Sequence, residues 1–280
     1  MKKRILGYFI FLTAIVFFIT GYTEELKEMA KVENLLNYEE TKEKIRAQAL
    51  SLEMIDEWKE WEKDDSFTWY DYMCTYFVTG ASKQEELKKY AKVLMETNPD
   101  EYGEFIGYLT AIWKDLVYFP VPDSPIDDEV EVTYEDSWMY ERTFGGARGH
   151  EGTDLMAVKN ERGIYPIISV SDGVVEKIGW LPKGGYRIGI RSPNGAYFYY
   201  AHMYDYAKDF QPGDNVYAGD FLGFMGDSGY SEIEGTVGNF DVHLHLGVYV
   251  NQPDGTEMSI NPYWITKYLE RNKLKYGFTK

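Results

Sequence analysis

Cysteine is almost absent from this sequence. Its 280 residues contain one, Cys74, which excludes an internal disulfide framework and a zinc site built from several cysteines. Cys74 lies in the stretch WYDYMCTYFV, among aromatic residues. We therefore expect a buried, unreactive thiol there and not a nucleophile.

Basic residues are also scarce. The chain has 29 lysines and arginines against 46 aspartates and glutamates, which gives a formal net charge of −17. Because phosphate binding needs a basic face, this balance argues against a nucleic-acid partner. It also argues against electrostatic binding to an anionic membrane surface, except at the extreme N-terminus. Elsewhere the acidity favours solubility.

Charge is missing from one long stretch at the N-terminus. Lys2, Lys3 and Arg4 precede eighteen uncharged residues, 5–22, and a helix of that length covers ~27 Å at ~1.5 Å per residue, close to the thickness of a bilayer core. The basic cluster favours a cytoplasmic N-terminus, with the rest of the chain outside. We therefore predict a transmembrane signal anchor at residues 1–22 of a single-pass cell-membrane protein. A cleaved signal peptide, which would give a secreted protein, is the competing interpretation, although the sequence before Tyr22 is a poor cleavage site.

Residues 23–118 favour helices and contain no catalytic constellation. Apolar residues from Ile45 to Ile55 have helical spacing, and Ser82 with Glu85 predicts a capping box. The stretch 98–101, which reads NPDE, predicts the end of one helix and the start of the next. This region is expected to be a small helical domain or stalk that provides spacing or contacts a protein partner.

The character of the sequence changes after a proline-containing linker at residues 119–131. From residue 132 it shows short β-rich runs, such as YPIISV, GVVEKIGW, YRIGIRS, AYFYYAHM and VHLHLGVYV. Turn signals such as residues 192–195, SPNG, separate these runs. The sequence therefore predicts an all-β domain over residues 132–280.

Histidine is rare and confined to one region. The four histidines are His150, His202, His243 and His245, and the first half of the chain has none. Because alternate side chains of a strand leave opposite faces, the last two should leave the same face. Two imidazoles are costly to bury side by side without partners, so the pattern indicates a functional pair.

A stretch that contains a histidine and an aspartate precedes the β-rich runs. His150 opens the stretch HEGTD, in which Asp154 lies four residues on. Gly149 and Gly152 disfavour a helix there, so both side chains should come from a loop that leads into a strand, and Glu151 is not placed as a general base. A catalytic zinc ion takes three protein ligands, and these two residues with one of the two strand histidines would supply them. The two histidines that remain could accept the proton of an attacking water or stabilise an oxyanion.

These motifs together resemble a known family. GHEGTD, then AH ending at residue 202, then HLHLGVY are similar to the signature of the lysostaphin-like (LytM-type) zinc metalloendopeptidases of bacterial cell walls. The resemblance covers about residues 140–264. It implies one Zn²⁺ ion per chain and gives roles to five residues: the zinc ligands His150, Asp154 and His245, and the catalytic pair His202 and His243.

The resemblance also implies the fold class. The chain would be α+β overall, with an N-terminal transmembrane helix, a small helical region and then an all-β antiparallel domain of the duplicated hybrid motif. Lipoyl and biotinyl carrier domains share this architecture. A carrier should present a lysine at a hairpin tip, and the sequence offers no such tip.

One loop departs from the family pattern. The segment from Asp227 to Asp241 is longer than usual and has Asp241-Val242 where Gly-Pro is common. It should border the cleft, and we predict that Glu232 and Glu234 bind substrate there by meeting a free amine.

The resemblance implies a membrane-anchored, extracytoplasmic zinc metalloendopeptidase that hydrolyses peptide bonds in peptidoglycan. Stem peptides and cross-bridges are both compatible with the site, and so are glycine bridges and D-alanyl cross-links. A non-hydrolytic cell-wall or sporulation scaffold or activator is the alternative, although relatives in such roles usually lack some of the ligands. A third possibility, a peptidoglycan-binding module without turnover, would tolerate loss of His202.

Overall fold

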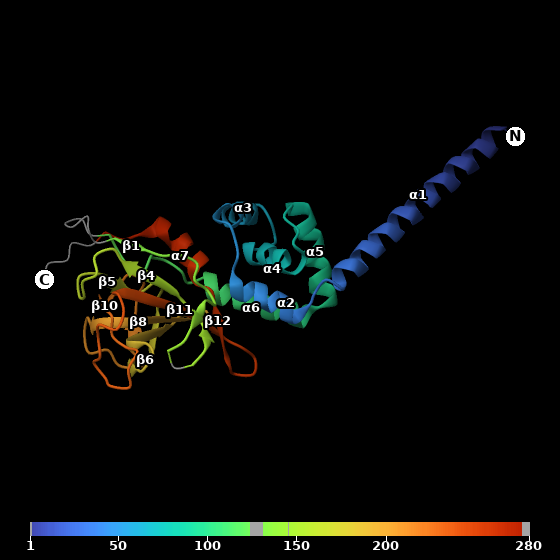
Figure 1. Ribbon diagram of the computed structural model, residues 1–280. Helices are drawn as coiled ribbons and strands as arrows, with labels where there is room; N and C mark the ends of the chain where they lie inside the picture. The colour runs from blue at the N-terminus through green and yellow to red at the C-terminus, as the bar shows by residue number, and fades with distance from the viewer. Residues whose placement is uncertain (1, 124–130, 145, 276–280) are drawn as a thin grey trace. The chain divides into compact units, whose positions relative to one another are not determined.

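The chain groups into two compact units. The computed structural model describes residues 2–123, 131–144 and 146–275 (Figure 1). One unit combines Met1–Lys42 with Trp58–Ile106, and the other combines Glu43–Glu57 with Gly107–Lys280. The division that the sequence predicts, with boundaries at residues 22, 118 and 131, remains a prediction.

Among the described residues, six helices precede the β-rich part of the chain. They are α1 (Lys2–Glu33), α2 (Tyr38–Ala47), α3 (Leu52–Glu62), α4 (Trp69–Thr79), α5 (Gln84–Thr97) and α6 (Pro99–Trp113). The predicted junction of α5 and α6 is confirmed. The predicted capping box at Ser82 is wrong, because Lys83 is the N-cap of α5 and no side chain caps it. A capping box occurs instead at α4, between Thr68 and Asp71. On α4, Cys74 is fully buried as expected, and burial raises the pKa of its thiol.

The helical pattern from Ile45 to Ile55 is interrupted between α2 and α3. Gln48 has a left-handed backbone with φ of 49°, which ends α2. Its side chain is fully buried, and its Oε1 accepts a hydrogen bond of 2.7 Å from Trp113 Nε1 on α6. A buried polar partner distant in sequence therefore overrides the local helical spacing.

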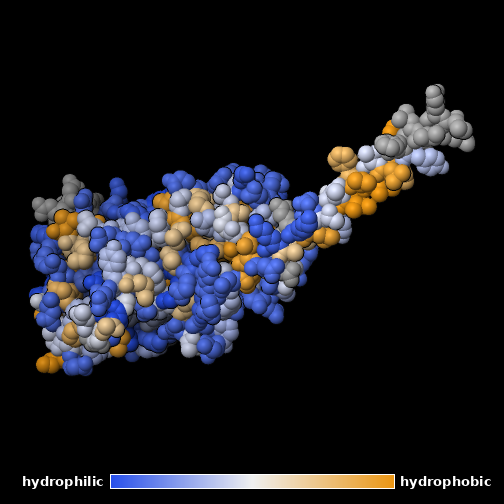
Figure 2. All heavy atoms as spheres, turned by 45° about the vertical axis from the view of Figure 1, so that its right-hand side comes forward, coloured by the Kyte–Doolittle hydropathy of each residue, from blue (hydrophilic) through white to orange (hydrophobic). Residues whose placement is uncertain are grey.

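The predicted transmembrane signal anchor, the membrane contact through this helix and the single-pass membrane location are wrong. Within the part of the chain that the structure describes, no helix is long and apolar enough to cross a membrane. The helix α1 continues without a break past the uncharged stretch into residues 24–33, of which six are charged. Apolar side chains on α1, such as Phe17, are exposed (Figure 2).

The second unit is built on an antiparallel sheet. Its strands are β1 (Val132–Thr133), β4 (Thr153–Ala157), β5 (Pro166–Ile168), β6 (Gly173–Leu181), β7 (Gly185–Arg191), β8 (Tyr197–Tyr206), β9 (Asn215–Val216), β10 (Phe221–Met225), β11 (His243–Asn251) and β12 (Glu257–Ile260). The main order is β1-β4-β11-β8-β7-β6-β9, with β10 beside β5 and β8, and β12 beside β11. A separate hairpin pairs β2 (Glu141–Arg142) with β3 (Arg148–Gly149). Each of the five β-rich runs that the sequence predicts contains a strand.

A short helix departs from the prediction that residues 132–280 are all β. It is α7 (Tyr263–Leu269), which continues into a 3₁₀ turn at Glu270–Asn272. Ile265 and Leu269 of α7 are buried, so this helix packs into the unit through an apolar face.

The core of this unit determines which face of β11 is free for a site. Leu244, Leu246 and Val248 alternate along β11 and are at most 1% exposed. Side chains at the intervening positions must leave the other face. His243 and His245 occupy two of those positions, so the predicted shared face is confirmed.

Part of the predicted linker packs into the same unit. Phe119 and Val121 are buried, and Ile168 N of β5 donates a hydrogen bond of 2.9 Å to Pro120 O. Residues 124–130 of the predicted linker lie outside the described residues. The described part is therefore attached to the sheet through its backbone and its apolar side chains.

Candidate active site

Three predicted metal ligands converge on one point. His150 Nε2 lies 3.0 Å from Asp154 Oδ1 and 3.1 Å from His245 Nδ1, and His245 Nδ1 lies 2.9 Å from Asp154 Oδ1. Ligand atoms of a tetrahedral zinc ion at ~2.1 Å from each donor would lie about 3.4 Å apart. The three donor atoms thus form a triangle slightly smaller than the one a bound zinc ion would require.

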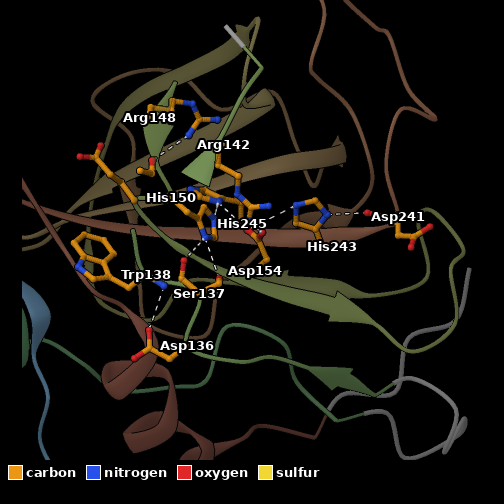
Figure 3. Close-up of polar contacts among 12 residues, drawn as sticks. Asp136, Ser137, Trp138, Arg142, Arg148, His150, Asp154, Asp241, His243 and His245 are labelled. Carbon is orange, nitrogen blue, oxygen red and sulfur yellow. Dashed lines mark hydrogen bonds and ion pairs between the residues drawn. The ribbon is translucent and has the colours of Figure 1, made fainter. Parts of the chain in front are cut away.

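The sheet brings these ligands together. Asp154 on β4 is the register partner of His245 on β11, so the two side chains are cross-strand neighbours. His150 follows β3 and leads through Gly152 into β4, as expected for a loop that enters a strand (Figure 3). A stretch of five residues and a distant strand therefore supply all three donors.

Two residues that the sequence analysis did not single out hold the ligands in place. Ser137 Oγ lies 3.0 Å from His150 Nδ1, and Ser137 O lies 3.2 Å from it. A proton on Nδ1 that is donated to the carbonyl leaves Nε2 with a lone pair for a metal ion. Arg142 Nη2 donates to Asp154 Oδ2 at 2.7 Å, which leaves Oδ1 to face the two histidines (Figure 3).

Gly152 makes room for a ligand ring. A Cβ atom added to it would lie 2.5 Å from His245 Nε2 and closer still to Cε1, which real atoms do not tolerate. The glycine in HEGTD is therefore required by close packing of the third ligand.

The two predicted catalytic histidines lie beside the ligands. The rings of His202 and His243 have their centroids 4.6 Å apart, and His243 Nε2 lies 3.8 Å from Asp154 Oδ1. His243 Nδ1 lies 2.7 Å from Asp241 O, and His202 Nδ1 lies 2.8 Å from Ser228 O. Because each carbonyl can only accept, each ring donates from Nδ1 and keeps Nε2 as an acceptor.

His202 occupies a strained position in its strand. Its φ is 62°, and the register of β8 shifts against both β7 and β10 near this residue. Bulges of this kind redirect a side chain and are common beside active sites. No pattern in the sequence predicts this strain.

Burial sets the protonation states that the site needs. It lowers the pKa of His202 well below its ordinary range, and the neighbouring histidines lower it further. Burial also lowers the pKa of His245, against the hydrogen bond to Asp154, which raises it. Burial would by itself raise the pKa of Asp154, but the close His150 and His245 rings outweigh it and hold the pKa well below its usual range. A neutral imidazole beside an ionised carboxylate is the state that binds a metal ion.

The site opens into a cleft of about 530 Å³. His150, His202 and His245 line it, together with tyrosines and basic residues of β3, β6, β7 and β8. Asp154 and Arg142 border a neighbouring cavity of about 410 Å³. A larger cavity of about 710 Å³, lined by residues such as Arg162 and Asp227, contains none of the five predicted residues.

The long loop reaches this cleft through aromatic side chains. Tyr230 lines the cleft, and its ring lies 4.8 Å from that of Phe240, which lies 4.7 Å from His202. Glu232 and Glu234 are exposed and are not among the residues that line the cleft. Their role in substrate binding remains a prediction.

Two histidines and an aspartate lie together at the mouth of a cleft in an antiparallel β domain, and two more histidines lie beside them. This arrangement is typical of a hydrolase site. Residues 148–262 match the sequence profile of Peptidase family M23. A crystal structure from Ruminococcus gnavus ATCC 29149, assigned as a glycyl-glycine endopeptidase lytM, is 40% identical, with a TM-score of 0.68 over 84% of this chain and 93% of that one. The chain belongs to peptidase family M23, as the resemblance predicted.

Two further relatives match about half of this chain. The L-Ala–D-Glu endopeptidase of Bacillus subtilis (strain 168) is 42% identical over 139 residues, which are 50% of this chain. The match spans 41% of the length of that relative. The catalytic domain of lysostaphin from Staphylococcus simulans is 26% identical over 49% of this chain and 92% of that one, with a TM-score of 0.38.

Proposed function

We propose that this protein is a zinc metalloendopeptidase that hydrolyses a peptide bond in bacterial peptidoglycan. The observation that carries the proposal is the triangle of donor atoms from His150, Asp154 and His245, with sides of 2.9–3.1 Å. Membership of peptidase family M23 supports the reaction class. The name of the Bacillus subtilis relative makes an L-Ala–D-Glu bond the first substrate to test. Peptidoglycan lies outside the cytoplasmic membrane, so the proposed reaction takes place there.

The donor set fits a zinc ion. Among the described residues, the single group that could hold a metal ion consists of His150, Asp154 and His245, and two imidazoles with one carboxylate leave a fourth tetrahedral position open. When bound, zinc lowers the pKa of a water molecule toward ~7 and polarises a carbonyl group. Ser137 and Arg142 hold the donors in the orientation that this binding needs.

The chain supplies the proton transfers through its two other histidines. His202 and His243 each keep an acceptor nitrogen, because each donates from Nδ1 to a backbone carbonyl. Either nitrogen can take the proton of the attacking water, and the same nitrogen can then donate it to the leaving amine. A protonated imidazole can also donate to the developing oxyanion.

Two variants test this division of roles. His245→Ala should lose zinc and activity together, because it removes a ligand. His202→Ala should keep its zinc and lose about 10²–10⁴ in rate, as is typical for loss of a general base or an oxyanion donor. Elemental analysis measures the zinc content of each variant, and turnover of a peptidoglycan fragment measures its activity. Wild-type turnover by the His202 variant would contradict the assignment, and zinc-loaded wild type that cleaves no wall preparation would favour a scaffold.

A further inference from the structure

The cleft carries more positive charge than the rest of the chain would suggest. Although the formal net charge is −17, four basic side chains and two acidic ones line the cleft. Both acidic side chains already have partners within the protein. Glu257 pairs with Arg191 at 2.9 Å and with Lys177 at 3.9 Å, and Glu151 accepts a hydrogen bond of 3.0 Å from Ser259.

Three of the four cations are left without a carboxylate. Arg148, Lys183 and Arg187 line the cleft, and none of them has an ion pair with any residue in the described part of the chain. Lys177, the fourth cation, already forms an ion pair with Glu257. The surplus positive charge therefore lies on the hairpin strand β3, on β7 and on the turn that precedes β7.

Each of the two guanidinium groups also has one buried nitrogen without a hydrogen-bond partner among the described residues. Arg187 Nη1 and Arg148 Nε are buried, and neither has a partner among the described residues. The one hydrogen bond of the Arg148 side chain is long, 3.5 Å to Gly149 O. Buried N–H donors without acceptors cost free energy, and a ligand that supplies the acceptors recovers it. Both arginines line the cleft that His150, His202 and His245 share (Figure 3 shows Arg148).

A carboxylate is the chemical group that matches these donors. A guanidinium group presents a planar fork of N–H donors that a carboxylate accepts in pairs, and the ionic hydrogen bonds are stronger than neutral ones. A glutamyl residue in a peptide has two carboxyl groups, and only one of them continues the chain. The other is free beside the scissile bond, whereas a bond between two glycines or two alanines offers none there.

We propose that Arg187 and Arg148, assisted by Lys183 at the rim, bind the free carboxylate of an acidic residue next to the scissile bond. The inference rests on the proposed function and makes it more specific: the substrate is an acidic stem peptide and not a glycine bridge. Arg187 and Arg148 determine specificity and take no part in proton transfer.

Matched substrates test the proposal with the full, zinc-loaded chain. One peptide contains an L-Ala–D-Glu bond with the free carboxylate, and the other has that carboxylate converted to the amide. Wild type should prefer the acidic peptide in kcat/KM by about ten- to a hundredfold, the usual effect of a hydrogen bond to a charged group. Arg187→Gln and Arg148→Gln should each reduce this ratio, and Arg187→Lys, which keeps the charge without the fork, should give an intermediate ratio. Lys208→Gln, which removes an exposed cation outside the cleft, should keep the wild-type ratio.

Zinc content and melting temperature show whether each variant is folded. Equal cleavage of both peptides by wild type, or an unchanged ratio in folded Arg187 and Arg148 variants, would overturn the inference while leaving a peptidase. Cleavage of neither peptide by zinc-loaded wild type would overturn the proposed function and the inference with it.

Discussion

Arg142 shows how a residue can control the site through its contact with a metal ligand. It donates to the outer oxygen of Asp154 at 2.7 Å and, among the described residues, is the only arginine or lysine paired with that carboxylate. Without it, the carboxylate would be free to rotate and turn either oxygen toward the histidines. The metal affinity of the site should therefore depend on this contact.

We expect Arg142→Gln to weaken zinc binding by about 10–100-fold, the usual effect of removing a partner of a metal ligand. Arg142→Lys keeps the charge but not the geometry, so its zinc affinity should lie between those of Arg142→Gln and wild type. Zinc dissociation constants from competition with a chelator measure both. Wild-type affinity in Arg142→Gln would show that Asp154 needs no support.

Gly152→Ala should damage the site without unfolding the domain. The added methyl group would collide with the His245 ring, so the third ligand would be displaced and zinc lost. Gly103→Ala in α6 is the control, because a Cβ atom there meets nothing within 4 Å and alanine favours a helix. Elemental analysis and thermal unfolding separate the two effects. Full zinc content in Gly152→Ala would contradict the packing argument.

The sequence predicted the five site residues but not the residues that position them. The histidines were visible because there are only four in the chain and two of them alternate along one strand. Ser137, Arg142 and Ser228 belong to common residue types, and two of them act through backbone carbonyls. Such contacts depend on how loops from different strands meet, and no spacing in the sequence encodes them.

At the scale of the secondary-structure elements, strand β8 carries the strain of the site. His202 has a positive φ in the middle of a strand, a conformation that costs a non-glycine residue ~1–2 kcal/mol. The bulge turns its ring toward His243, so strain is retained where the proposed chemistry needs it.

Replacement of His202 should therefore reveal the strain. His202→Gly and His202→Ala both remove the ring, but glycine adopts this backbone without penalty. Since glycine also gains entropy in the unfolded chain, we expect His202→Gly to be more stable than His202→Ala by about 1 kcal/mol. Chemical denaturation of the zinc-free proteins measures the difference. Equal or greater stability of the alanine variant would mean that the bulge is not strained.

The strands followed their sequence patterns more closely than the helices did. The β-rich runs could be recognised from their composition and from the turn signals that separate them. The break after α2 could not be predicted, because it depends on a hydrogen bond between Gln48 and Trp113, 65 residues apart. The short α7 was missed because its few residues carry no long periodic pattern.

On the scale of the whole molecule, one carboxylate helps to hold together the helical unit, Met1–Lys42 with Trp58–Ile106. In the helical unit, Asp65 joins separate elements: its Oδ2 accepts from Tyr72 on α4 and Lys88 on α5, each at 2.7 Å. The hydrogen bond from Lys88 outweighs burial, which acts in the opposite direction, and holds the pKa of Asp65 well below its usual range. The unfolded chain therefore takes up a proton before the folded unit does as the pH falls.

The stability of this unit should therefore depend on pH in a specific direction. The contribution of Asp65 is fully present above its ordinary pKa of 3.8 and is lost as the pH falls below that value. Asp65→Asn should lower the stability of the unit at neutral pH. It should also make the loss of stability between about pH 5 and pH 2 smaller than in wild type. Asp64→Asn, which changes an exposed neighbour, should keep the wild-type slope. Parallel pH profiles of thermal unfolding for Asp65→Asn and wild type would contradict this account.

The central claim, that the convergent donors make this chain a zinc-dependent peptidase of peptidoglycan, has one most direct test. The full chain is incubated with purified peptidoglycan, and new peptide termini are identified by mass spectrometry, with and without a chelator. We expect one class of new termini, next to a glutamyl residue, that disappears with the chelator and returns when zinc is restored. No new termini with the zinc-loaded chain, or the same termini in the presence of the chelator, would contradict the claim.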